Sequence, residues 1–284
     1  MTAKRNRSGR ALSRAARESS RRDHAIGIFD SGIGGLTVVQ ALLRMLPREI
    51  LIYLGDTART PYGTKSVEVV RRYSVENTEF LIAKGVKLLV VACNTSSAAA
   101  LGILKDRYEV PVIGVIEPGA AAAVAATRNR KIGVVGTEAT IASGEYTRAL
   151  RRLRSDLEIY TRACPLFVPL AEEGWVDNAV ARSVARLYLG SLRHSGIDTL
   201  ILGCTHYPLL HDVIAETMGD GVRLIDSATA TAAAVRDTLT RCGLLRRRGG
   251  GAASFFVTDT PERFIKVGSR FLGAQVDSAV RIER

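Results

Sequence analysis

The sequence predicts an α/β protein with two similar domains, each built on a mainly parallel sheet that helices flank. From residue 25 onward, short β-branched runs alternate with Ala-rich helical stretches, as in parallel α/β proteins. Two of these runs, 87–92 and 199–203, are largely apolar, which is typical of strands buried on both faces. The segments 85–93 and 196–204, each running from Gly to Cys, are near-copies of each other. We therefore expect two pseudo-twofold related halves with an active site in the crevice between them.

Predicted strands and helices follow one another along this whole region. Apolar residues at helical spacing predict helices in the segments between strands. The clearest examples are Leu36-Val39-Leu42-Leu43, Val67-Val70-Tyr73 and Val180-Val184-Leu187-Leu192. Nine strands are predicted, at residues 25–30, 50–54, 87–92, 111–114, 131–136, 157–161, 198–203, 222–225 and 254–258.

The duplication predicts where one domain ends and the other begins. The opening segment 26–31 resembles 132–137, and each is followed at a similar distance by one of the two matching cysteines. We assign residues 25–117 to the first domain and 118–225 to the second. Residues 226–284 either finish the second domain or cross back to complete the first, and we assign them to the first.

Positive charge is concentrated at the N-terminus of this basic chain. The 284 residues carry a net charge of +12, and residues 1–24 contain eight basic but only two acidic residues. This Ser/Arg-rich segment is predicted to be a disordered tail. Residues 246–251 (Arg-Arg-Arg-Gly-Gly-Gly) are predicted to form an exposed loop. The tail either keeps the protein in solution or binds polyanions weakly, since basic tails bind phosphate backbones without specificity.

Composition also excludes several classes of protein. No apolar run approaches the roughly 20 residues that span a bilayer, and the polar N-terminus lacks the apolar core of a signal peptide. The four cysteines (Cys93, Cys164, Cys204 and Cys242) are scattered through a chain too long to need disulfides. We therefore expect a cytoplasmic protein with free thiols and no membrane partner.

Cys93 and Cys204 follow matching strands, at the place where open α/β sheets present chemistry. A single cysteine there would be a small buried hydrophobic residue, but the matched pair favours reactive thiols. Polar residues that could bind a carboxylate follow each of them, Asn94-Thr95 and Thr205-His206. Nearby positive charge or a helix N-terminus lowers a thiol pKa from about 8.5. Thiol and thiolate would then coexist near neutral pH, as proton transfer in both directions requires.

His206 has three interpretations. It is a proton partner of Cys204, a core histidine bonded to a backbone carbonyl, or a zinc ligand together with Cys93 and Cys204. Zinc is disfavoured, because the chain has neither a Cys-x-x-Cys nor a His-Glu-x-x-His pair. Cys164 and Cys242 have no comparable polar neighbours and are expected to be structural.

The segment 30–36 (Asp-Ser-Gly-Ile-Gly-Gly-Leu) joins the first strand to a helix. Its glycines allow a tight turn, and free N–H groups at a helix start attract anions. The segment is therefore either a structural turn or an anion site. Asp30 itself either assists a base or caps the helix.

Two other loops carry polar residues that could face the same crevice. The turn 57–63 follows the second strand, so Tyr62 and Gly63 should lie near the edge of the sheet that carries Asp30. In the second half, Glu172 and Glu173 are predicted to lie in a loop, from which either one could approach the second thiol.

Four of these segments together resemble the motif set of glutamate racemases, which belong to the cofactor-independent aspartate/glutamate racemase superfamily. They occur in order along the chain, and the likeness covers about residues 25–272. Four motifs in register are much harder to obtain by chance than any one of them. They are Phe29-Asp30-Ser31-Gly32-Ile33-Gly34-Gly35, Pro61-Tyr62-Gly63, Ala92-Cys93-Asn94-Thr95-Ser96 and Gly203-Cys204-Thr205-His206-Tyr207-Pro208.

The resemblance implies racemisation of glutamate by two bases, with no cofactor and no metal. Cys93 would serve one face of the substrate and Cys204 the other, and Asp30 and His206 would assist the two thiols. Glu172 would be an auxiliary acidic residue, with Glu173 as the alternative. The implied substrate-binding residues are Asp30, Ser31, Tyr62, Gly63, Asn94, Thr95, Thr205 and His206.

The resemblance also implies a biological setting. D-glutamate would supply peptidoglycan synthesis, and so cell-wall biogenesis and cell shape, in a bacterial cytoplasm. Members of the family often form dimers, so a homodimer is expected. The nearest alternative is a racemase of the same superfamily that acts on aspartate or another small amino acid. A polyanion-binding protein that works through the basic tail is the alternative of a different class.

Overall fold

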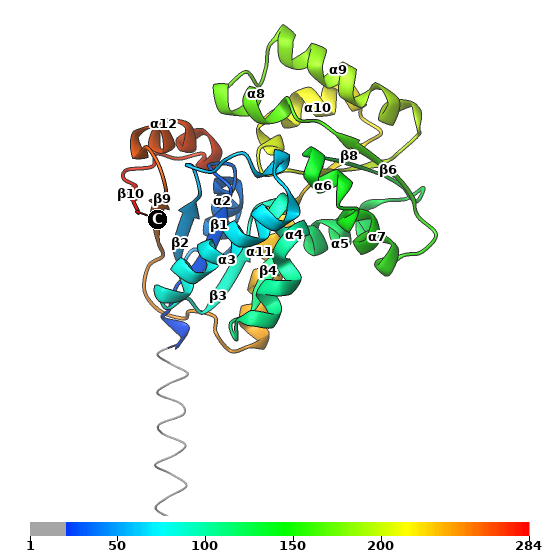
Figure 1. Cartoon of the computed structure of the whole chain (residues 1–284). Coiled ribbons are helices and arrows are strands. Elements are labelled where there is room, and N and C mark those ends of the chain that lie inside the picture. The colour runs from blue at the N-terminus through cyan, green and yellow to red at the C-terminus, as the bar shows by residue number, and fades with distance from the viewer. Residues whose placement is uncertain (1–20, 284) are drawn as a thin grey trace, which may run out of the picture.

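Two parallel β-sheets flanked by helices make up the fold in the computed structural model, which describes residues 21–283 (Figure 1). The larger sheet has the strand order β10-β9-β2-β1-β3-β4, and the smaller one has the order β6-β5-β7-β8. The predicted fold class is therefore confirmed. The strands span Ile26–Asp30 (β1), Ile50–Gly55 (β2), Leu88–Val91 (β3), Val112–Gly114 (β4), Lys131–Gly136 (β5), Glu158–Ala163 (β6), Thr199–Gly203 (β7), Arg223–Asp226 (β8), Ala252–Val257 (β9) and Val280–Arg281 (β10).

Helices connect these strands and cover the faces of both sheets (Figure 1). Within the described residues, none of them has the length and apolarity needed to cross a membrane. The α-helices span Leu36–Met45 (α2), Val67–Ala83 (α3), Asn94–Arg107 (α4), Ile116–Ala126 (α5), Glu138–Ala142 (α6), Glu145–Leu153 (α7), Phe167–Glu173 (α8), Ala179–His194 (α9), His211–Met218 (α10), Ser227–Arg241 (α11) and Pro261–Leu272 (α12). The 3₁₀ helices span Tyr62–Thr64 (η1) and Tyr207–Leu210 (η2).

The nine predicted strands are all present, with ends that differ from the predicted ones by no more than about two residues, an ordinary uncertainty for element boundaries. The tenth, β10, was not predicted. It consists of two exposed residues at the edge of the larger sheet. So short a strand has no alternation of apolar and polar residues that could reveal it.

The two sheets share one topological unit. In each, the first strand lies between the second and the third, and the fourth follows the third: β2-β1-β3-β4 and β6-β5-β7-β8. The strands β3 and β7 therefore occupy equivalent places, and Cys93 and Cys204 lie just beyond their carboxyl ends. The carboxyl ends of parallel strands are where open α/β sheets bind their ligands.

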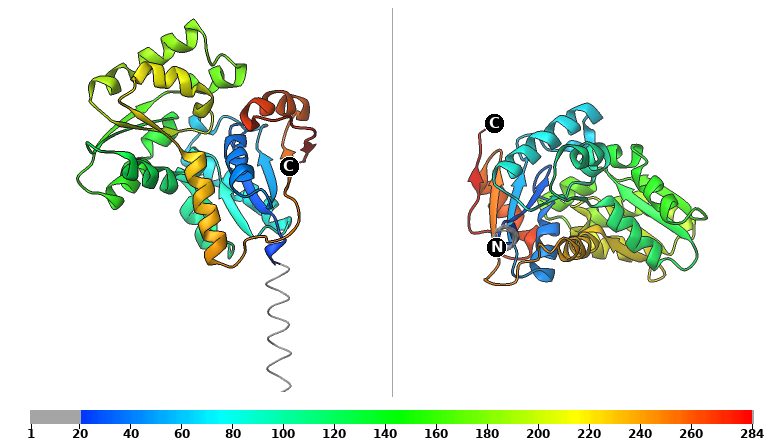
Figure 2. Two further views of the ribbon diagram at one scale, coloured as in Figure 1. Left: turned by 180° about the vertical axis from the view of Figure 1, so that it is seen from behind. Right: turned by 90° about the horizontal axis from the view of Figure 1, so that it is seen from below.

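Two helices carry the chain between the sheets. The helix α5 leads from β4 to β5, and α11 leads from β8 back to β9, which pairs with β2. Along its length, α11 packs against α2 and α5 (Figure 2). The larger sheet thus takes strands from residues 26–114 and 252–281, and the smaller one from residues 131–226. The domain boundaries at 117/118 and 225/226 stay a prediction.

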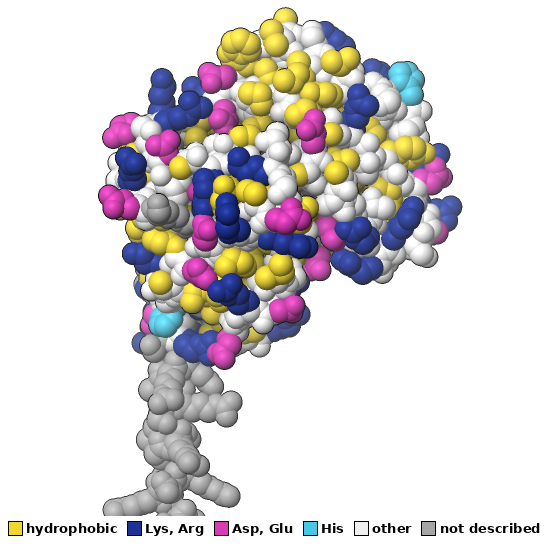
Figure 3. Space-filling model, in the orientation of Figure 1, with side chains coloured by type: hydrophobic (Ala, Val, Ile, Leu, Met, Phe, Trp, Pro, Cys, Tyr) yellow, Lys and Arg dark blue, Asp and Glu magenta, His cyan; other side chains and the backbone are white. Residues whose placement is uncertain are grey.

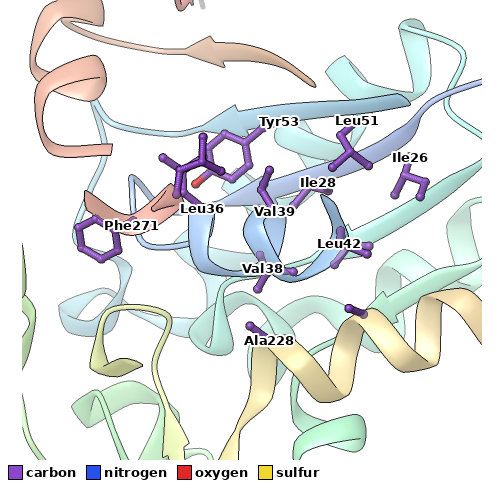
Figure 4. Close-up of a cluster of buried hydrophobic side chains, with 14 of the residues drawn as sticks. Ile26, Ile28, Leu36, Val38, Val39, Leu42, Leu51, Tyr53, Ala228 and Phe271 are labelled. Atoms are coloured by element: carbon purple, nitrogen blue, oxygen red, sulfur yellow. The ribbon is translucent and has the colours of Figure 1, made fainter. Parts of the chain in front are cut away.

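The helix α2 closes one face of the larger sheet, as its apolar spacing predicts. Leu36, Val39 and Leu42 are fully buried against the sheet (Figure 4). Burial of each such side chain contributes about 1.5–3 kcal/mol of stability. At the start of this helix, the Tyr53 hydroxyl donates a hydrogen bond to the Gly32 carbonyl at 2.8 Å. This contact fixes the loop that enters α2.

The predicted apolar face of α9 is wrong in part. Val180 and Leu187 are 48% and 70% exposed, respectively. The buried face instead contains two alanines together with Leu189 and Leu192. Alanine on this face lets α9 pack closely against α10, so the larger apolar residues are left outside.

The first described residues are attached to the loop at 246–251. The Arg22 guanidinium donates to the Gly243 carbonyl at 2.7 Å, and Arg246 pairs with Asp23 at 3.3 Å. The segment 246–251 is a loop, as predicted. The Arg246 side chain, however, is only 16% exposed because of these contacts. Up to residue 20, the predicted disordered tail lies outside the described residues.

Candidate active site

The first thiol lies at the carboxyl end of β3. Cys93 is 5% exposed and is the N-cap of α4, where its sulfur accepts a hydrogen bond from the Ser96 N–H at 3.5 Å. Burial, together with the neighbouring Asp30 carboxylate, raises the pKa of Cys93 to about 11, although hydrogen bonding to the sulfur opposes the shift. The expectation of a lowered pKa is therefore wrong for this residue, because burial outweighs these hydrogen bonds, and Cys93 is a thiol at neutral pH.

Asp30 ends β1 beside this thiol and is fully buried. Its carboxylate accepts a hydrogen bond from the Gly32 N–H at 3.0 Å, and the Gly35 N–H also points to it. Burial raises the pKa of Asp30, although these N–H groups and His206 oppose the shift. Because the carboxylate engages these N–H groups, the segment 30–36 is a turn built around Asp30.

The second thiol follows β7 and faces a histidine. Cys204 is 6% exposed, and its sulfur lies 3.8 Å from His206 Nδ1. On the other side of the ring, Nε2 lies 3.1 Å from Glu172 Oε1. Burial alone would lower the pKa of His206, but the sulfur and the carboxylate raise it to about 10. His206 is thus an imidazolium at neutral pH, with the Cys204 sulfur on one side of the ring and the Glu172 carboxylate on the other.

Of the two candidate acidic residues, Glu172 is the one that reaches the histidine, and Glu173 is exposed. Both belong to α8, not to a loop as predicted, and this helix ends at Gly174 in the left-handed conformation. Hydrogen bonding to His206 and the charge of Arg263 lower the pKa of Glu172. The Arg263 guanidinium, on α12, lies 3.3 Å from this carboxylate. Sequence reasoning did not single out Arg263.

Thr205 joins the two halves beside the second thiol. Its hydroxyl donates to Asp30 Oδ1 at 3.5 Å, and its carbonyl accepts from Thr37 Oγ1 at 3.2 Å. Gly34 passes so close to Thr205 and His206 that a Cβ at this position would overlap both. Glycine is therefore required sterically where the loop after β1 meets the second half. Asp30 consequently interacts with groups of both thiol environments.

Three threonine hydroxyls also meet between the halves. Thr95 Oγ1 lies 3.0 Å from Thr137 Oγ1 and 3.1 Å from Thr140 Oγ1. Gly63 packs directly against Thr137. Thr137 and Thr140 were not singled out from the sequence. Thr137 could have been found from the duplication, because it occupies the position in segment 132–137 that Ser31 occupies in segment 26–31.

A buried polar network holds the turn that contains Tyr62. The Tyr62 hydroxyl donates to the Asp56 carboxylate and accepts a hydrogen bond from Asn77 Nδ2 at 3.1 Å. Arg59 Nε lies 2.7 and 3.0 Å from the two Asp56 oxygens. The phenol of Tyr62 is thus engaged within the first half. Sequence reasoning missed Asp56 and Arg59, although Asp56 follows β2 as Asp30 ends β1.

One polar atom near the first thiol, Asn94 Nδ2, is buried without a hydrogen-bond partner in the described part of the chain. It belongs to the first turn of α4. Leaving such an atom unpaired costs about 1–3 kcal/mol, so it needs an explanation in the function of the site. A helix start with a donor of this kind is suited to binding a carboxylate.

The other two cysteines lie apart from this arrangement. Cys164 is buried in the second core, where burial raises its pKa to about 12. Cys242 is exposed at the end of α11. All four cysteines are free. Among residues 21–283, no group of three or more His, Cys, Asp or Glu side chains is arranged to hold a metal ion.

Comparison with known proteins decides the family. The model of the Asp/Glu/hydantoin racemase family matches residues 26–235. The chain belongs to this family. The glutamate racemase of Geobacter metallireducens is 56% identical over 259 residues, which make up 91% of this chain and 96% of that protein.

Solved structures agree with this assignment. The glutamate racemase RacE1 of Bacillus anthracis has a TM-score of 0.90 and 42% identity, covering 92% of this chain and 98% of that one. The glutamate racemase of Francisella tularensis in complex with D-glutamate has a TM-score of 0.87 and 37% identity, with the same coverage of 92% and 98%. The predicted family and the predicted enzyme class, an amino-acid isomerase, are confirmed.

Proposed function

We propose that this chain interconverts L-glutamate and D-glutamate by a cofactor-independent mechanism that uses two thiols. The observation that carries the proposal is the pair of thiols at the ends of equivalent strands, each with its own proton partner. Cys93 lies beside Asp30, and Cys204 lies beside His206. The choice of substrate is supported by the names of the relatives, including the Francisella enzyme in complex with D-glutamate.

The reaction needs a base and an acid on opposite faces of the α-carbon. A thiolate takes the α-proton while the electron pair of the C–H bond moves toward the carboxylate, and the opposite thiol gives its proton to the other face. The thiolate has then become a thiol and the thiol a thiolate, so the protons balance. Burial keeps Cys93 protonated in the free enzyme, and His206 lies beside Cys204 as its proton partner.

Donors around the thiols bind the substrate and stabilise the charge that develops during the reaction. Asn94 Nδ2 is available to a carboxylate at the start of α4. The hydroxyls of Thr95 and Thr137 offer a second polar position between the halves. Preorganised donors in a water-poor site usually supply the largest part of such stabilisation. The predicted contacts of Ser31, Tyr62, Gly63, Thr205 and His206 with the substrate are part of this proposal.

The test is incubation of the purified enzyme with L-glutamate in D₂O without pyridoxal phosphate or added metal. We expect optical activity to be lost while one deuterium enters at the α-carbon, as proton exchange with solvent through a thiol requires. L-aspartate in a parallel reaction distinguishes the neighbouring substrate, and we expect it to exchange much more slowly. A folded enzyme that incorporates no deuterium into glutamate would contradict the proposal.

The wider setting is proposed on the same basis. D-glutamate made by this enzyme would enter peptidoglycan synthesis in a bacterial cytoplasm, and so support cell-wall biogenesis and cell shape.

A homodimer is also proposed, supported by exposed apolar side chains that gather over α8 and α9 (Figure 3). They are Leu166, Trp175, Val180 and Leu187. Weak polyanion binding by the basic tail is supported by its charge alone.

A further inference from the structure

One buried tyrosine contacts the neighbours of both thiols. Tyr146 belongs to α7 in the second half and is 2% exposed. Its hydroxyl lies 2.7 Å from Oδ1 of Asn94, the residue that follows Cys93. Its ring lies against Gly203, the residue before Cys204, where an added Cβ would come within 2.9 Å of Tyr146 Cε2. A single side chain thus connects the two strand ends that carry the thiols.

The two helices that carry the chain between the sheets enclose the hydroxyl of Tyr146. A Cβ on Gly119 of α5 would lie 3.5 Å from this hydroxyl and 3.3 Å from Ser227 Cβ. Ser227 is the first residue of α11, and its side chain lies at the same glycine as the phenol. Burial raises the pKa of Tyr146, so the phenol keeps its proton. The tyrosine is therefore held in place by elements of both halves.

This hydrogen bond determines which way the Asn94 amide faces. A phenol has a single proton to donate. The Tyr146 hydroxyl donates it to the carbonyl oxygen of Asn94. The NH₂ group of the amide must then point away from Tyr146. This group is the Nδ2 atom that is buried without a partner in the described residues.

We propose that Tyr146 is a positioning residue, which holds the Asn94 amide with Nδ2 directed at the substrate carboxylate and braces Gly203 beside the second thiol. This inference rests on the proposed racemisation. Tyr146 acts through Asn94 and Gly203, not by touching the substrate. Without its hydroxyl, the amide is free to turn its oxygen toward the carboxylate, which would repel it. Because Nδ2 binds the carboxylate before and during the reaction, the loss appears mainly in KM.

The test is a double-mutant cycle on the racemisation of L-glutamate. Tyr146→Phe is expected to raise KM about tenfold and to lower kcat less than about threefold. Asn94→Ala should lower kcat/KM about 100-fold, since it removes the donor itself. In the Asn94→Ala background, Tyr146→Phe should cost less than about twofold, because its partner is already absent. If the losses of kcat/KM in the two single variants multiply in the double variant, the two residues act independently and the proposal is overturned.

Tyr188→Phe is the matched control. The Tyr188 hydroxyl accepts a hydrogen bond from the Leu166 N–H at 3.3 Å, wholly within the second half. This variant also loses one hydroxyl of a packed tyrosine, and we expect a wild-type KM. An equal rise of KM in Tyr188→Phe would show that any loosening of the second half has this effect, and it would overturn the proposal.

A substrate-free cycle separates this inference from the proposed function. Urea unfolding of wild type, Tyr146→Phe, Asn94→Ala and the double variant measures the hydrogen bond itself. We expect a coupling of about three- to tenfold in the unfolding equilibrium constant. A wild-type enzyme that does not exchange the α-proton of glutamate would contradict the proposed function while this coupling is still measured. Absence of coupling would overturn the role of Tyr146.

Discussion

The two halves of the molecule share a strand order but surround their thiols with opposite electrostatics. Cys93 lies beside the buried carboxylate of Asp30, and its pKa is raised to about 11. Cys204 lies 3.8 Å from His206, whose own pKa is raised to about 10. The first thiol thus has a buried carboxylate as its neighbour, and the second has an imidazolium. The repeated topology places the two thiols equivalently, and their neighbours differ in charge.

This asymmetry is located at two positions of the repeat. Asp30 in the first half corresponds to Gly136 in the second, and His206 in the second half corresponds to Thr95 in the first. The first half therefore has a carboxylate beside its thiol, and the second half has an imidazole. Racemisation needs one thiol protonated and the other ionised at the moment of reaction, with the two states exchanged by each turnover. The two positions next to the thiols give the two faces different proton partners.

Removal of either thiol should have the largest effect. Cys93→Ala and Cys204→Ala are each expected to lower the rate of racemisation by about 10² to 10⁴, the usual contribution of an acid or base residue. Polarimetry with L-glutamate and with D-glutamate measures both directions. Cys164→Ala removes a buried thiol that lies apart from the site and should keep most of the activity. Near-normal turnover of either site variant would contradict the use of two thiols.

The raised pKa of the first thiol should be visible in its reactivity. At pH 8, iodoacetamide is expected to label Cys93 at least about tenfold more slowly than exposed Cys242, because the thiolate is the nucleophile and burial disfavours it at Cys93. Peptide mass spectrometry after partial labelling gives this ratio. The ratio should fall as the pH approaches 11, where Cys93 ionises. Equal labelling at pH 8 would mean that the buried environment beside Asp30 does not keep Cys93 protonated.

Features with a local signal could be predicted from the sequence. Strands such as 87–92 appear as short apolar runs bounded by turn residues, and the two Gly-to-Cys segments indicated the duplication directly. The candidate residues Asp30, Cys93, Cys204 and His206 followed from their positions after strands, since the carboxyl ends of parallel strands share one edge of a sheet.

Features that depend on long-range packing could not be predicted in this way. The pairing of Arg263 with Glu172 and the contact of Tyr146 with Asn94 join segments that are far apart in the chain. The pKa of Cys93 depends on how deeply the fold buries its sulfur, which a strand-end position does not reveal. Exposure of Leu187 on α9 likewise depends on the small residues that face α10.

Neutralising the carboxylate behind the histidine should have a smaller effect than removing a thiol. Glu172→Gln is expected to lower kcat/KM about tenfold, because the imidazolium beside Cys204 loses its stabilising anion. Its exposed neighbour provides the matched control, and Glu173→Gln should stay within about twofold of wild type. Steady-state kinetics at pH 8 compares the two variants. If the two variants have the same kcat/KM, the contact between Glu172 and His206 does not contribute to catalysis at the second thiol.

The last prediction concerns the pH dependence of stability, where turnover is not involved. The pKa of His206 is about 10 in the fold against 6.5 in the unfolded chain. Its contribution to the unfolding free energy is therefore complete below pH 6.5 and is lost as the pH rises toward 10, by at most about 1.4 kcal/mol per pH unit. Urea unfolding of His206→Asn should show a flatter decline between pH 6.5 and 9. This range lies below that in which Cys93 titrates in the fold.

Exposed His211 provides the control for this measurement, and His211→Asn should keep the wild-type slope. The two variants remove the same type of side chain, so a difference between them reports only on the buried environment of His206. A wild-type slope in His206→Asn would assign the pH dependence to another group. The imidazolium would then not distinguish the two halves in the free enzyme.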